Sequence, residues 1–144
     1  MILTRPGLWA ATFHSAKNVK TLGTIVHEDH THHYGDVTNM GSVFDELGGS
    51  KSLRISLTSA EGSHAISPRP PLVLDRAAAG SLEASIRKEG FEFAIVDVRT
   101  PRWRRKWPHR LMGPEALTSV PADLTDLVFY MRAMTPNTLA PGVE

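Results

Sequence analysis

The sequence has no cysteine among its 144 residues, which excludes disulfide bonds and thiolate chemistry. It also has no apolar run near the roughly 20 residues that cross a bilayer, so we expect no membrane partner. The first 13 residues lack the continuous apolar stretch of a secretory signal, because Arg5, Pro6 and Gly7 interrupt it. These absences suit a reducing compartment, and the cytoplasm is the location that we expect.

An excess of charge of either sign is also missing. The chain has 16 Lys and Arg residues against 15 Asp and Glu residues, a net charge of +1 with histidine neutral. This balance provides no global attraction to nucleic acid, and we expect no such partner. The hydrophobic content of 41% supports a packed core rather than disorder. The length predicts a single domain over residues 1–144, with residues 1–20 as an irregular lead-in.

The most distinctive segment is the histidine-rich run His27-Glu28-Asp29-His30-Thr31-His32-His33, which holds four of the seven histidines. It follows the apolar residues 22–26, which predict a buried strand. If that strand belongs to an α/β sheet, His27 lies at its carboxyl end, where such sheets place ligands. Imidazole acts as general base, general acid or metal ligand, and His27 and His30 are the favoured pair. The alternative is a surface loop whose histidines meet only water.

Hydrophobic periodicity predicts the remaining elements. Met40, Val43, Phe44 and Leu47 follow a helical spacing, and we expect them to be buried against the sheet. A second helix starts at Gly80-Ser81, and strands are predicted over residues 53–58, 91–98 and 124–131. The order predicts an α/β fold with a mostly parallel sheet of four to five strands and two main helices. Two helices are too few to cover both faces of such a sheet, so we expect part of a larger α/β fold.

Several short motifs occur in a fixed order along residues 21–136. They are His27-Glu28-Asp29-His30 with Met40-Gly41, Glu61-Gly62-Ser63 after a strand, Gly80-Ser81-Leu82-Glu83 before a helix, Val96-Asp97-Val98-Arg99 at a strand end, and Thr135-Pro136. In this order and spacing the chain resembles the carboxyl-terminal third or so of the erythromycin esterase family. Glu28 stands where the family has Asn. The family's amino-terminal half, which supplies another catalytic histidine and acidic residues, is absent.

The resemblance implies an ester hydrolase that acts on a bulky lactone or ester. His27 would help to activate water, with His30 or Asp97 orienting it, and no cofactor is implied. It also implies that the chain is a carboxyl-terminal fragment with part of a site, so that the isolated chain is a weak enzyme or none. The expected partners are a small-molecule ester or lactone and either the missing amino-terminal half or a second copy of the chain.

Two other functions fit the histidine-rich run. Zinc accepts imidazole nitrogen and carboxylate oxygen, so His27, His30, His32 and His33 are candidate metal ligands, although the reading that we favour has no metal. Alternatively, residues 27–33 serve a non-catalytic module that binds a partner.

The segment over residues 99–110 combines six basic residues with Trp103 and Trp107. Arginine and tryptophan together suit nucleic-acid binding, but we favour a solvated loop whose tryptophans pack on the body of the domain. In an esterase this loop would border the cleft, with Trp103 and Arg99 as substrate-binding residues. Asp97 precedes the loop and either orients a histidine, caps a helix or pairs with an arginine.

Overall fold

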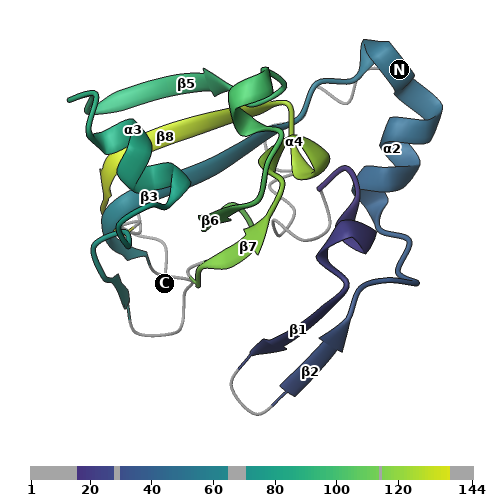
Figure 1. Cartoon of the computed structure of the whole chain (residues 1–144), viewed down its shortest axis with the longest axis horizontal. Helices are drawn as coiled ribbons and strands as arrows, with labels where there is room; N and C mark the ends of the chain where they lie inside the picture. The colour runs from purple at the N-terminus through teal and green to yellow at the C-terminus, as the bar shows by residue number, and fades with distance from the viewer. Residues whose placement is uncertain (1–15, 28–29, 65–70, 114, 137–144) are drawn as a thin grey trace, which may run out of the picture.

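The computed structural model describes residues 16–27, 30–64, 71–113 and 115–136. Its body is a four-stranded sheet in the order β4-β3-β8-β5 (Figure 1). The strands of this sheet are β3 (Ile55–His64), β4 (Leu72–Leu74), β5 (Phe93–Asp97) and β8 (Leu127–Met134). Two separate hairpins are formed by β1 (Thr24–His27) with β2 (His30–His33) and by β6 (Trp107–His109) with β7 (Leu117–Ser119).

Short helices connect these strands. The α-helices are α2 (Met40–Gly48), α3 (Leu82–Arg87) and α4 (Pro121–Leu124). Three 3-10 turns accompany them, η1 (Val19–Leu22), η2 (Gly49–Lys51) and η3 (Pro101–Trp103). None of the helices in the described ranges is long and apolar enough to cross a membrane.

The predicted α/β class is confirmed, and the main sheet has four strands, within the predicted four to five. One of them is β4, which was not predicted, whereas the predicted strand at residues 22–26 lies outside this sheet, and the strand directions differ from the prediction. Only β3 and β8 run parallel, whereas β5 pairs antiparallel with β8 and β4 pairs antiparallel with β3. Apolar patterning identifies a strand without specifying its direction, because both pairings bury the same side chains. Strand β5 is also not buried on both faces, since Phe93 and Ile95 are largely exposed.

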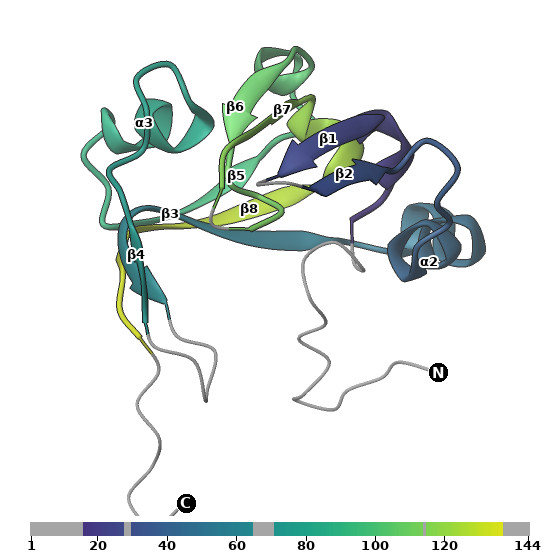
Figure 2. The same ribbon diagram turned by 90° about the horizontal axis from the view of Figure 1, so that it is seen from below.

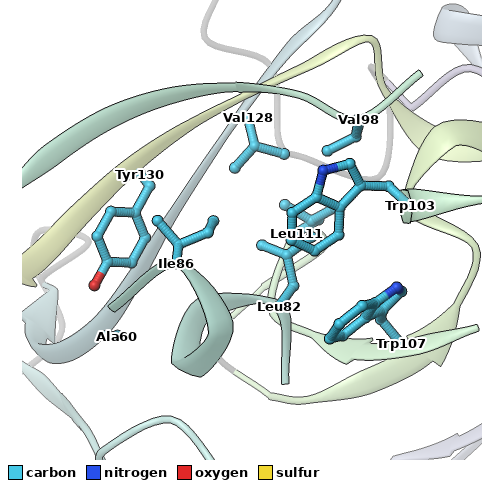
Figure 3. Packing of buried hydrophobic residues seen from close by; sticks show 9 residues of the cluster. All are labelled: Ala60, Leu82, Ile86, Val98, Trp103, Trp107, Leu111, Val128 and Tyr130. Atoms are coloured by element: carbon cyan, nitrogen blue, oxygen red, sulfur yellow. The ribbon is translucent and has the colours of Figure 1, made fainter. Parts of the chain in front are cut away.

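The core lies on one face of the main sheet, where α3, η3 and the β6/β7 hairpin cover β3, β5 and β8 (Figure 2). Figure 3 shows the side chains that meet there, with Leu82 and Ile86 of α3 beside Val128 and Tyr130 of β8. The other members of this cluster are Ala60, Val98, Trp103, Trp107 and Leu111. A smaller cluster packs η1 against α4 through Ala16, Val19, Met112 and Leu124.

Helix α2 forms where the sequence predicts it, but it is not buried. Asn39 caps its first turn, and Gly49 ends it in a left-handed conformation with φ of 48°. Val43, Phe44 and Leu47 are nevertheless exposed, because α2 lies beyond the start of β3 rather than over the sheet (Figure 2). The helix is held by polar contacts instead. The Arg54 guanidinium donates to the carbonyl of Gly41 at 2.6 Å and to Asp45 at 2.7 Å.

Candidate functional site

The histidine-rich run folds as the β1/β2 hairpin and not as a strand of the main sheet. The expectation that His27 ends a strand of that sheet is therefore wrong. A hairpin between neighbouring segments closes a very short loop, and strand patterning alone does not distinguish it from a long-range pairing. Glu28 and Asp29 lie outside the described residues.

The hairpin register places His27 directly opposite His30, and Thr24 opposite His33. The Thr24 hydroxyl and Nδ1 of His33 form a hydrogen bond of 3.2 Å at the exposed end of the hairpin. The side chains of residues 25–32 are outside the described structure. No group of three or more potential metal ligands occurs among the side chains that the structure describes. The hydrolytic and metal-binding roles of His27 and His30 both remain predictions.

Asp97, at the end of β5, is paired with Arg99. Its carboxylate accepts hydrogen bonds from the Arg99 backbone and Nε at 2.9 Å, and from a terminal guanidinium nitrogen at 2.7 Å. These hydrogen bonds from Arg99 lower the pKa of Asp97 to about 2. The arginine-paired alternative is the arrangement found. Asp97 is consequently ionised at neutral pH and holds Arg99 at the head of the 99–110 loop.

The tryptophans of the 99–110 loop are buried, as predicted. The centroids of the Trp103 and Trp107 rings lie 5.0 Å apart (Figure 3). The guanidinium of Arg102 lies 4.7 Å from the Trp103 ring, and that of Arg105 lies 4.3 Å from the Trp107 ring. Trp103 also lines a cavity of about 370 Å³ with Phe91, Phe93 and Ile95. Trp103 therefore lies at an apolar cavity, as its predicted substrate-binding role requires. Arg99, the other predicted substrate-binding residue, does not line this cavity.

A buried carboxylate under α3 was not predicted as a site residue. Glu83 is fully buried, and its Oε1 accepts hydrogen bonds from the Thr58 hydroxyl at 2.7 Å and the Arg110 backbone at 2.8 Å. Among the described residues, neither its Oε2 nor the buried Tyr130 hydroxyl, on the same face of the sheet, has a hydrogen-bond partner. In the sequence Glu83 ends the Gly80-Ser81-Leu82-Glu83 motif and stands in the first turn of a helix, and neither feature gives a sign of burial. Through these two hydrogen bonds, Glu83 of α3 is linked to β3 at Thr58 and to the segment after β6 at Arg110.

His109 was also not predicted as a site residue. It is fully buried, its Nδ1 accepts a hydrogen bond from the Leu111 backbone at 3.3 Å, and Nε2 lies 2.7 Å from the Ser119 hydroxyl. Because Nδ1 accepts, Nε2 carries the proton and donates to Ser119. Burial lowers the pKa of His109 to about 4. The ring is therefore neutral at pH 7. Because its Nε2 donates to Ser119, it does not act as a base toward that hydroxyl.

The second face of the main sheet is open and apolar. Ile55, Leu57, Phe93 and Ile95 are 53%, 37%, 66% and 67% exposed, and the Phe93 ring stacks at 6.5 Å from Phe129 between them. We refer to these five residues as the open face. In the register Leu57, Phe129 and Ile95 stand side by side across three strands. On β3 the covered face holds Thr58 while the open face holds Ile55 and Leu57, so this strand turns its most apolar side to the open face.

Comparison with known proteins finds similarity in fold only. No family model matches the sequence, and no curated protein matches it. A solved succinoglycan biosynthesis protein is similar with a TM-score of 0.63 and 17% identity, over 86% of this chain and 32% of that protein. A solved Bacillus cereus protein is similar with a TM-score of 0.54 and 13% identity, over 68% of this chain and 28% of that protein. The chain thus spans about a third of the length of these structures.

Proposed function

We propose that this chain is one part of a larger α/β hydrolase of the erythromycin esterase type, which hydrolyses a bulky ester or lactone with histidine-activated water. The observation that carries the proposal is the open face, an apolar sheet surface in a fold whose solved neighbours are about two and a half times as long as this chain. The motif order along residues 21–136 supplies the choice of chemistry.

The open face is suited to permanent cover by a layer of polypeptide. Monomeric proteins rarely expose contiguous apolar patches of more than a few hundred Å². Here Phe93, Ile95 and Phe129 form an aromatic and aliphatic centre without a charged side chain. The cores of permanent protein–protein interfaces have the same composition. The layer that fits is a helical one with an apolar stripe.

The proposed chemical contribution of this chain is the pair His27 and His30. The register of the β1/β2 hairpin places these two residues opposite each other, next to the turn of one short element. One imidazole that accepts a proton from water contributes about 10²–10⁴-fold to an ester hydrolysis. Donors for the oxyanion and a further acid or base would come from the covering layer, since Asp97 is bound by Arg99. The isolated chain is then expected to show little turnover.

The test compares the isolated chain with a longer protein that adds the in-frame coding sequence preceding Met1. Both are assayed with aryl esters and macrolide lactones. We expect turnover only in the longer protein, and a loss of about 10²-fold or more in kcat/KM for His27→Ala. His33→Ala, at the exposed end of the same hairpin, is the matched control and should change kcat/KM by less than about threefold.

The result that would overturn the proposal is full activity in His27→Ala, or no hydrolysis by the longer protein. A chelator separates the alternatives. Turnover that survives chelation supports the histidine-activated water, and turnover lost on chelation favours the metal hydrolase.

A further inference from the structure

A strongly cationic cavity lies beside α3, apart from the histidine hairpin and from the open face. Its volume is about 510 Å³. Four basic side chains and three alanines line it, and no carboxylate does so; these residues are Arg76, Arg87, Lys88, Arg132, Ala77, Ala79 and Ala84. A surface hollow with cations alone in its wall is suited to an anion.

The cavity lies near the carboxyl ends of the only parallel strand pair in the described sheet. Arg132 is in the last half of β8, next to the position where β3 presents the buried Ala60. Ala77 is tied to that point, because its backbone N–H donates to the carbonyl of Ala60 at 2.6 Å. The carboxyl end of parallel strands is where open α/β sheets bind their ligands.

The basic side chains are only partly neutralised. Arg87 contacts Glu61 at 3.3 Å and Arg132 pairs with Glu92. Within the described ranges, the side chains of Arg76 and Lys88 form no ion pair. Nε of Arg87 is buried and finds no hydrogen-bond acceptor in the part of the chain that the structure describes, and a buried donor left unpaired costs free energy. Two positive charges and one unpaired N–H group thus remain for a ligand.

We propose that this cavity binds a small molecule bearing a phosphate or diphosphate group. Two uncompensated cations match a dianion better than a single carboxylate. Guanidinium groups present forked N–H donors that fit phosphate oxygens, and Lys88 adds a point charge. The alanine walls leave room for close approach, and the volume is that of a small organic ligand rather than of a bare ion.

The test uses pyrophosphate and phenyl phosphate as probes, titrated by calorimetry and by two-dimensional amide NMR at physiological salt. We expect amide shifts at Ala77, Ala79 and Ala84. The double variant Arg76→Ala/Lys88→Ala should weaken pyrophosphate binding at least tenfold, because it removes the two uncompensated charges. Lys51→Ala, an exposed lysine outside the cavity, is the matched control and should weaken it less than twofold.

Three outcomes would overturn the proposal. The first is that Lys51→Ala weakens pyrophosphate binding as much as Arg76→Ala/Lys88→Ala does, which would mean non-specific attraction to surface charge. The second is citrate binding as tightly as pyrophosphate, which would mean a carboxylate site. The third is tighter binding of a single-stranded oligonucleotide with shifts in residues 99–110, which would mean a nucleic-acid surface. None of these measurements uses the hydrolase assay. A negative result for phosphate binding is therefore distinguishable from a negative result for the proposed hydrolase function.

Discussion

At the scale of single residues, His109 shows how the interior decides the chemistry of a side chain. Burial between β6, β7 and the Leu111 backbone lowers its pKa to about 4, against about 6.5 in an unfolded chain. Four histidines in the 27–33 run stand out in the sequence, whereas His109 is hidden among arginines and tryptophans. Only its burial makes it distinctive.

The low pKa of His109 predicts a dependence of stability on pH. Between pH 6.5 and 4 the unfolded state binds a proton that the folded state does not, so the free energy of unfolding falls as pH decreases through this window. The free energy of unfolding has its full value above pH 6.5, and at pH 4 it is lower by about 3 kcal/mol. Urea unfolding at several pH values measures it.

The control substitutions separate His109 from other acid-sensitive groups. His109→Gln keeps a donor toward Ser119 without a titrating ring, and its free energy of unfolding should vary less between pH 6.5 and 4. His33→Gln, on the exposed hairpin end, should retain the dependence of the natural chain. Identical pH dependence in His109→Gln and the natural chain would contradict the prediction.

At the scale of elements, α2 and α3 have similar sequence signals and opposite environments. Asn39 and Ser81 cap them in the same way, each accepting a hydrogen bond from the backbone three residues later. Leu82 and Ile86 of α3 are buried against the sheet, whereas Phe44 and Leu47 of α2 are 44% and 80% exposed. The apolar stripe of α2 is therefore a second surface without cover among the described residues.

This difference predicts unequal costs for truncating the two helices. Leu82→Ala removes a fully buried side chain and should cost about 2–5 kcal/mol of unfolding free energy. Phe44→Ala removes a half-exposed ring and should cost about 1 kcal/mol or less. Denaturant unfolding of both variants provides the measurement. A loss for Phe44→Ala as large as for Leu82→Ala would show that α2 is packed in solution.

At the scale of the whole molecule, the open face is an apolar surface that no described element covers. Its apolar residues come from three strands and stand side by side only once the sheet has formed. Contact with water at this face costs about 25 cal/mol for each Å² of apolar surface. Without a covering layer, copies of the chain should therefore associate through it.

Ile95→Glu tests this association directly. A charge at the centre of the open face should lower the weight-average mass in sedimentation and reduce binding of an apolar dye. It should change the unfolding free energy by only about 1 kcal/mol, because Ile95 is already 67% exposed. Thr118→Glu adds the same charge to an exposed position of β7 and should leave association unchanged. Equal association in both variants would place the contact elsewhere.

The sequence by itself determined the local features of this protein. Helical spacing and Asn39 located α2, Ser81 located the start of α3, and apolar runs located β3, β5 and β8 of the main sheet but not β4. The insertion of Trp103 and Trp107 into the body was also predictable, because two indoles among charges gain most by burial. Such features depend on neighbours within a few residues, and those neighbours are visible in the sequence.

Only the tertiary structure decided which surfaces meet. It turned β5 antiparallel to β8, paired β1 with β2 outside the sheet, and left the apolar stripe of α2 uncovered. It also brought Arg76, Arg87 and Arg132 around one cavity from three separate segments. Periodicity indicates that a side is apolar but not what covers it, since that depends on contacts between residues far apart in the chain.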